Sequence, residues 1–394
     1  MPIDSDIVLI GTGIAPLVCA SKFLSEGKSV LLLNPDWDFF QENSELPLSP
    51  LLSFDKQEDI EEALVILNAN YPGSIESWPK KSDTQNSEFH DFLAPHLRVR
   101  DQIWIYSNQD THFDLKNTNY QNCRQVDGLS AYLKFPGHSS KIPTCNAKGV
   151  LLPKTYDIDI NRYRYGVLDF IKERLTFSNI ICFASQIELT QEGIRYHAQN
   201  TAYTTKINEG LLVFWTPRLT AWILNQAKKT EVTPLLPRGI RLWEQWSLVS
   251  KEPLDPAYIG HFEDLTVWAE VEGFPPTDLT KLHLSVLKSG ALLKLDLKNN
   301  TNLLAHESLW TSMASAESFQ SLAKLCYQFL NWKSFSIRSM QPRAIFEWDT
   351  TTSNNALFTF NTFPFKNYVV CGGDGVFTQV IKQTQSAVDI LLKN

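Results

Sequence analysis

The stretch DIVLIGTGIAPLVCASKFLSEGKSVLLL, residues 6–33, decides the fold of this chain. It opens with Asp6–Ile10, an apolar run typical of a strand that is buried on both faces. A turn with two glycines follows, and then a helical segment that stops at Gly27, a natural residue just after a helix. Ser29–Leu33 is a second apolar run. Strand, glycine turn, helix and strand in this order predict a βαβ unit.

The turn in this unit has the spacing of a dinucleotide-binding fingerprint. Gly11 allows the tight turn and Gly13 lets the backbone approach a pyrophosphate, which binds at the helix N-terminus. The sequence departs from the fingerprint twice. Pro16 replaces the third glycine, and the second strand ends at Asn34, where an acidic residue usually binds a ribose hydroxyl. A βαβ unit that binds no nucleotide is the alternative at this point.

Composition argues against several classes of protein. The 394 residues are a length typical of two domains, and 43 Asp and Glu against 36 Lys and Arg give a net charge of −7, unlike a nucleic-acid binder. No apolar run approaches the roughly 18–20 residues that span a membrane, and the N-terminus has no signal-peptide layout. The 6 cysteines show no CxxC pair and the 8 histidines are isolated. We expect a cytoplasmic protein with reduced thiols, no metal site, no nucleic-acid partner and no transmembrane segment.

Hydrophobic periodicity predicts further elements outside the βαβ unit. Gln57–Asn70 has a helical period, and Arg98–Tyr106 alternates as a strand does. Residues 236–350 are expected to form a second domain of a sheet and helices, and Ser315–Phe329 reads as one such helix. The strands predicted in that region are Leu242–Val249, Leu265–Val271, Lys281–Leu287, Ala291–Leu297, Ser334–Ser339 and Arg343–Trp348.

From Gly149 onward the pattern becomes helix, strand, hairpin and strand. VLDFIKERL (167–175) is helical, NIICFAS (179–185) reads as a strand, and IELTQEGIRYHA (187–198) reads as a hairpin. GLLVFWTPRL (210–219) is an apolar strand that ends in a turn. This order adds a parallel strand beside the βαβ unit and a small antiparallel crossover above it.

The end of the chain supplies one more strand and helix. Asn367–Val370 is the strand, residues 371–375 (CGGDG) are a glycine-rich turn, and Thr378–Leu392 is a closing helix.

These segments resemble the D-amino-acid oxidase-like family of FAD-dependent oxidoreductases. Gly149, Pro153 and Asp157–Ile160 are similar to the family's turn before this helix. Residues 215–219 (WTPRL) resemble a family motif that ends a strand, without the glycine that precedes it, and residues 236–239 (LPRG) are similar to an element that often follows. Amine-oxidase-type flavoproteins share the topology and are the second resemblance.

The resemblance implies an α/β fold in two parts. One is a Rossmann-like FAD/NAD(P)-binding three-layer ββα domain built from discontinuous segments, residues 1–85, 149–235 and 350–394. The other is an α+β substrate or cap domain with a mostly antiparallel sheet, residues 86–148 and 236–349.

The resemblance also implies which residues bind FAD and substrate. The glycine-rich turn before the last helix lies against the flavin in the family, and the N-terminus of that helix favours the negative charge of the reduced ring. Asp374 is placed to approach the ribityl chain, while Arg338 and Arg343 are the candidates for binding a substrate carboxylate. No catalytic side chain is identified. The candidate FAD-binding residues are Gly11, Thr12, Gly13, Ile14, Ala15, Asn34, Gln186, Ile187, Trp215, Gly373, Asp374, Gly375 and Val376.

The sequence therefore predicts a FAD-dependent oxidoreductase that oxidises a C–N bond of a small amine or amino acid by hydride transfer to flavin N5. The alternative is a binding or assembly protein with a flavoprotein fold that no longer catalyses, as in Rab GDP-dissociation inhibitors. Pro16, Asn34 and the missing glycine before Trp215 favour that alternative. An NAD(P)-dependent dehydrogenase is a third hypothesis, but its nucleotide domain would be more continuous. The sequence indicates no particular protein partner.

Overall fold

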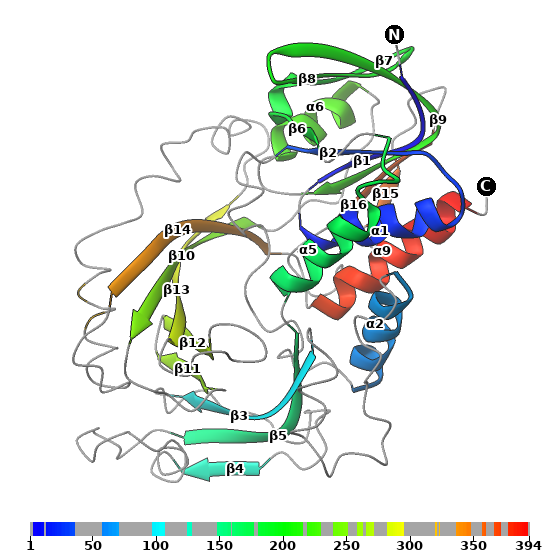
Figure 1. The fold of residues 1–394 in the computed structure, drawn as a ribbon. Coiled ribbons are helices and arrows are strands. Elements are labelled where there is room, and N and C mark those ends of the chain that lie inside the picture. The colour runs from blue at the N-terminus through cyan, green and yellow to red at the C-terminus, as the bar shows by residue number, and fades with distance from the viewer. Residues whose placement is uncertain are drawn as a thin grey trace.

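The computed structural model arranges the chain in two sheets with helices packed against the first (Figure 1). Among the described residues, no helix is long and apolar enough to cross a membrane. The described residues are 3–11, 13–35, 57–70, 97–106, 124–127, 148–158, 160–176, 180–215, 219–229, 239–250, 258–262, 265–271, 282–294, 320, 323, 336–347, 357–359, 366–371 and 377–392.

Parallel strands make up the centre of the first sheet. Their order across the sheet is β16 (Lys366–Cys371), β9 (Thr201–Trp215), β1 (Ile3–Ile10), β2 (Val30–Asn34) and β6 (Ile180–Ile181). Each strand is parallel to its neighbours in this series. The chain moves to one side of β1 for β2 and to the other side for β9. The strand order therefore reverses at β1, which makes β1 a topological switch point.

Helices pack against one another along this sheet. Figure 1 shows α1 (Ile14–Ser25), α5 (Ile160–Ile171) and α9 (Phe377–Leu392) side by side, and α2 (Gln57–Asn70) contacts α9 and α1. Because α1 contacts both α5 and α9 as well as β1 and β2, its residues are buried on almost every side. The resulting apolar core holds the helices to the sheet.

An antiparallel hairpin extends the first sheet. It consists of β7 (Ile187–Thr190) and β8 (Gly193–Ala198), and β8 pairs with the first residues of β9. Helix α6 (Thr220–Lys229) follows β9. At the other margin, β15 (Leu357–Thr359) is antiparallel to β16. The first sheet is therefore mixed, with the parallel and antiparallel parts that the sequence predicts.

The second sheet is antiparallel except where β11 and β3 pair in parallel. Its strand β5 lies almost entirely within residues 149–235, a segment that the sequence analysis assigns to the FAD-binding domain. The strands, in order across the sheet, are β14 (Ser336–Glu347), β10 (Gly239–Ser250), β13 (Leu282–Lys294), β12 (Leu265–Val271), β11 (Tyr258–Phe262), β3 (Leu97–Tyr106), β5 (Lys148–Ile158) and β4 (Arg124–Asp127).

Elements with strong local signals are confirmed. The βαβ unit is present as β1, α1 and β2, and α2 has the predicted bounds. Helix α1 stops as expected: Gly27 has φ of +78°, its N–H donates to Leu24 O at 3.1 Å, and the next N–H donates to Phe23 O at 3.0 Å. This pair of bonds satisfies carbonyls that the helix end leaves unpaired.

Three predictions of strand number or length are wrong. The two strands predicted around Gly290 are the single strand β13, and those predicted around Gln341 are the single strand β14. At Gly290 the register shifts by a bulge, which bends β13 without ending it. At Gln341 β14 continues in regular register with β10, and its bulge lies earlier, at Arg338. The strand predicted over residues 179–185 pairs only at Ile180–Ile181. Of the helix predicted over Ser315–Phe329, only residues 320 and 323 are described, and both are helical.

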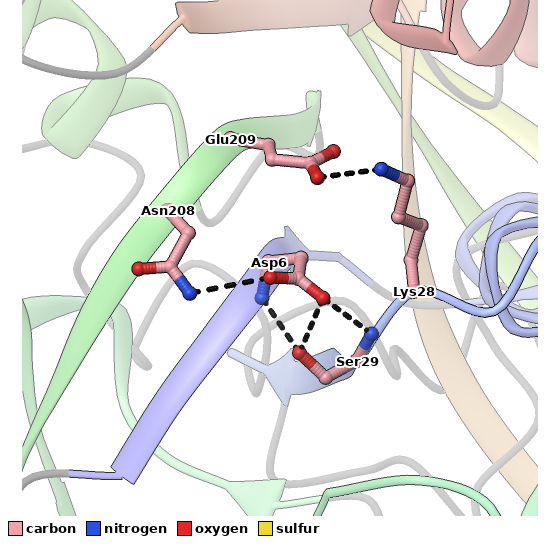
Figure 2. A network of polar contacts seen from close by, with 5 residues as sticks. All are labelled: Asp6, Lys28, Ser29, Asn208 and Glu209. Atoms are coloured by element: carbon pink, nitrogen blue, oxygen red, sulfur yellow. Dashed lines mark hydrogen bonds and ion pairs between the residues drawn. The ribbon is translucent and has the colours of Figure 1, made fainter.

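A polar network joins the start of β2 to β1 and β9 at the point where the register of β1 and β9 shifts (Figure 2). The Asp6 carboxylate accepts hydrogen bonds from Ser29 N at 2.9 Å, Ser29 Oγ at 2.8 Å and Asn208 Nδ2 at 3.2 Å. Asp6 N in turn donates to Ser29 Oγ at 2.8 Å. Lys28 pairs with Glu209 at 2.5 Å beside this group. The donated N–H of Ser29 is the largest cause that lowers the pKa of Asp6.

We expect the charge of Asp6 to stabilise the fold at neutral pH. Because the pKa of Asp6 is lowered in the folded state, this stabilisation is present above the ordinary carboxyl pKa and is lost as pH falls through the lowered value. Asp6→Asn should lower the free energy of unfolding by about 1 kcal/mol at pH 7, since Asp6 is only half-buried. The difference from wild type should shrink at pH values below about 4.

Urea unfolding at both pH values measures this difference. Glu209→Gln is the control, because its pair with Lys28 is exposed and should change stability by less than about 0.5 kcal/mol. An Asp6→Asn effect of equal size at both pH values would contradict a role for the charge.

Candidate functional site

The central strands of the first sheet all end at one edge, which we call the carboxyl edge. It is formed by the last residues of the five strands. These are Cys371, Trp215, Ile10, Asn34 and Ile181. The register places these ends within two residues of one another: Cys371 pairs with Trp215, Asn34 with Ile181, and Ile10 with Val213 and Leu33. In open α/β sheets, ligands bind at such an edge near the switch point.

The structure brings the predicted cofactor residues to the carboxyl edge from separate parts of the sequence. Gly11–Ala15 follow β1, Asn34 ends β2, and Trp215 ends β9. Gln186 and Ile187 follow β6 through the short 3-10 helix η2 (Ala184–Gln186). Thr12 and residues 373–376 lie outside the described residues. Four strand spacings of about 4.8 Å separate β16 from β6, so a ligand that contacts both has to be elongated, as a dinucleotide is.

Helix α1 presents its N-terminus at this edge. Gly13 stands at the N-cap with φ of +86° and ψ of −157°, a conformation that only glycine adopts without strain. Within the described residues, no side chain caps the helix here, and its first turn contains no acidic residue. Gly13, Ile14 and Ala15 are nevertheless buried. A buried, positive helix end with these properties fits a phosphate group.

Gly11 is required for packing as well as for the turn. A Cβ atom at this position would lie 2.6 Å from Phe214 Cβ and 3.1 Å from Phe214 Cδ2. Phe214 is buried near the end of β9. The Gly11 N–H donates to Leu33 O at 3.0 Å, so the turn stays bonded to β2 on the other side. The chain therefore leaves β1 through a space that admits no side chain.

Asn34 is fully buried at the end of β2. Its backbone oxygen accepts a hydrogen bond from Cys182 N at 2.9 Å, which fixes the strand end against β6. Burial raises the pKa of the Cys182 thiol to about 12. That thiol is therefore protonated at neutral pH and is a poor nucleophile for attaching a cofactor covalently.

The segment after β6 depends on a residue that the sequence analysis did not identify. Gln186 is exposed and Ile187 is buried, and the Ile187 carbonyl accepts a hydrogen bond from Trp222 Nε1 at 2.8 Å. Trp222 belongs to α6 and is also buried. The only sequence signal for this contact is a tryptophan in a short amphipathic segment, and its partner lies 35 residues away, beyond the reach of any local pattern. Phe214 was missed for the same reason, since its partner Gly11 follows the neighbouring strand β1 but lies far away in the sequence.

The candidate substrate residues lie on β14, in the second sheet. Arg343 pairs in register with Trp243 of β10. The register passes from Ile337 to Ser339 and skips Arg338, which is the extra residue of a bulge. Both side chains lie outside the described residues, so the carboxylate contact stays a prediction. In the part of the chain that is described, no cluster of His, Cys, Asp or Glu has the arrangement of a metal site.

No protein-family model matches the chain, and no curated protein matches it by sequence. Solved structures do match. NikD, an unusual amino acid oxidase essential for nikkomycin biosynthesis, has a TM-score of 0.63 at 11% identity, over 99% of this chain and 94% of its own. Glycine oxidase from Bacillus cereus has a TM-score of 0.60 at 10% identity, over 99% and 95%. A glycerol-3-phosphate dehydrogenase from Bacillus halodurans complexed with FAD has a TM-score of 0.54 at 13% identity, over 99% and 64%.

The chain thus has the fold of a group of oxidoreductases that includes amino acid oxidases and a protein crystallised with FAD. At these sequence identities the similarity establishes the fold alone. It confirms, at that level, the resemblance that the sequence indicates.

Gly11→Ala should destabilise the protein even without any ligand. The added Cβ meets Phe214 Cβ, and overpacking of this kind costs about 1–3 kcal/mol. Thermal or urea unfolding measures the loss. Gly27→Ala is a useful comparison, because nothing lies within 4 Å of its Cβ position and only backbone strain of about 1 kcal/mol is expected.

Phe214→Ala retains the Cβ and should relieve little of the clash, whereas Phe214→Gly removes it. The losses of Gly11→Ala and Phe214→Gly should therefore be less than additive in the double variant. Fully additive losses would show that this contact does not constrain Gly11.

Proposed function

We propose that the protein is a FAD-dependent oxidoreductase and that FAD lies along the carboxyl edge of the first sheet. The observation that carries this proposal is the convergence of separate predicted segments at one edge, beside a buried helix N-terminus that no described side chain caps. The FAD complex of a protein with the same fold supports it. The enzymes with this fold that are named above favour catalysis over the binding-protein alternative.

Each part of the edge has chemistry suited to one part of FAD. The N-terminal turn of α1 would bind the pyrophosphate through backbone N–H groups of Gly13–Ala15. Asn34 would hydrogen-bond the adenosine ribose, since the residue at the end of this strand usually does so. The adenosine half then belongs at the β2–β6 end and the flavin half at the β9–β16 end, where Trp215 and Gly373–Val376 would contact it.

The proposed reaction is oxidation of a C–N bond in a small amine or amino acid. Bound flavin supplies a two-electron acceptor for the hydride that leaves the carbon atom next to nitrogen. The protein's own part is to hold the substrate in the reactive orientation. Arg338 or Arg343 on β14 would bind a substrate carboxylate, because a guanidinium pairs with a carboxylate through two hydrogen bonds.

We also propose the division of labour that the resemblance implies. The first sheet with its helices and hairpin would form the three-layer FAD-binding domain, and the second sheet would form the substrate domain. Strand β5 pairs with β3 and β4, so the boundary proposed at residue 149 fits better just before α5. The free, buried thiols of Cys19 and Cys182 support a cytoplasmic location.

The absorbance spectrum of the purified protein tests the cofactor. We expect flavin bands, either on purification or after adding FAD and removing the excess. We also expect them to bleach anaerobically with an amine or amino acid and to return on admission of an electron acceptor. A colourless protein that takes up no FAD would contradict the proposal. A stable flavin spectrum that no amine or amino acid bleaches would favour the binding-protein alternative.

Asn34→Ala should weaken FAD binding by about tenfold, because it removes the side-chain hydrogen bond to the ribose. Quenching of flavin fluorescence gives the dissociation constant. Cys182→Ala is the matched control: Cys182 is a buried neighbour that bonds Asn34 through its backbone N–H, which the variant retains. Equal affinities in wild type and Asn34→Ala would remove Asn34 from the site.

A further inference from the structure

We propose that Trp222 is a positioning residue, which holds the segment Ala184–Ile187 at the adenosine end of the FAD site. This inference rests on the proposed function above. Trp222 belongs to none of the motifs of the sequence analysis, and it acts through the hydrogen bond from its Nε1 to the Ile187 carbonyl.

The hydrogen bond is short and enclosed. Trp222 Nε1 lies 2.8 Å from Ile187 O, and both residues are buried, with relative exposures of 8% and 4%. A buried carbonyl that loses its donor keeps the cost of its lost hydration, so this bond strongly favours one position of the chain at Ile187. The buried indole ring also covers the hydrogen bond and keeps water away from it.

The bond joins two segments that leave the carboxyl edge from different strands, β9 and β6. Trp222 lies in the first turn of α6, which follows the end of β9, whereas Ile187 begins β7, which follows the end of β6. Among the described strands, β7 pairs with β8 alone, and β8 in turn pairs with β9. The start of β7 is therefore connected to β9 in two ways. One is indirect, through the pairing of β7 with β8 and of β8 with β9, and the other is the direct hydrogen bond from Trp222.

Position along the edge determines which half of FAD this affects. β6 lies beside β2, whose last residue, Asn34, is the proposed ribose contact. The segment Ala184–Ile187 follows β6 and so faces the adenosine half. If the backbone at Ile187 shifts, the binding of every ligand that contains the adenosine half should weaken. FAD and ADP both contain it, so their affinities should fall by a similar factor.

The test compares Trp222→Phe with wild type. The variant retains an aromatic ring and removes the donor. We expect the dissociation constants of FAD and of ADP, measured by fluorescence quenching and by competition, to rise together by about tenfold. Ile223→Val is the matched control on the same helix: it removes one buried methylene group and leaves the indole bond intact. Its nucleotide affinities should remain within about twofold of wild type.

Each outcome decides a separate point. Equal losses of affinity in Trp222→Phe and Ile223→Val would show that Trp222 contributes only packing, and would overturn the inference. Unchanged affinity in Trp222→Phe would overturn it as well. If Trp222→Phe fails to fold, benzothienylalanine at position 222 keeps the shape of the indole without its N–H, and the same tenfold rise is expected. Wild-type protein that binds neither FAD nor ADP would overturn the proposed function and this inference with it.

Discussion

The missing side chain at Gly11 is the constraint on which the geometry of the candidate site depends. The position where its Cβ would stand is 2.6 Å from Phe214 Cβ, so β1 and β9 can approach closely at the point where the chain turns. The turn stays bonded to β2 through Gly11 N, and Gly13 then takes a positive φ that starts α1. Because α1 starts immediately at the strand end, its N-terminus lies at the switch point, which is where open α/β sheets bind ligands.

Polar groups find hydrogen-bond partners within the protein at one place on the first sheet, whereas the helix end at the carboxyl edge has no side-chain cap among the described residues. Beside the start of β2, Asp6 accepts hydrogen bonds from Ser29 and Asn208, and Lys28 pairs with Glu209 (Figure 2). At the carboxyl edge, within the described residues, the N-terminus of α1 has no side-chain cap, although it is buried. Helix N-terminal donors favour an anionic partner. The network therefore joins β1, β2 and β9 to one another, whereas the carboxyl edge has the uncapped helix end that suits an anionic ligand.

Local signals predicted the βαβ unit, helix α2 and the stop at Gly27, because each depends on neighbours within a few residues. The single strands β13 and β14 were each predicted as two, because Gly290 and Pro342 are residues that usually interrupt a strand. In the structure a bulge accommodates Gly290, and Pro342 lies on β14, which is at the edge of its sheet. The placement of the candidate residues on one edge followed from the strand order that the resemblance implied. The contacts of Gly11 with Phe214 and of Ile187 with Trp222 join distant segments, and no local pattern encodes them.

The two departures from the dinucleotide fingerprint are compatible with the geometry of the site. Pro16 is in the first turn of α1, where its missing N–H removes one donor and interrupts no helical hydrogen bond. Asn34 is fully buried, and a carboxylate there would require a compensating charge or would become protonated, whereas an amide requires neither. Both replacements preserve the path of the backbone, and in the proposed complex they would reduce the electrostatic contribution to nucleotide binding. They would therefore affect how tightly FAD binds, whereas the proposed reaction would depend on the β9–β16 end of the edge and on the second sheet.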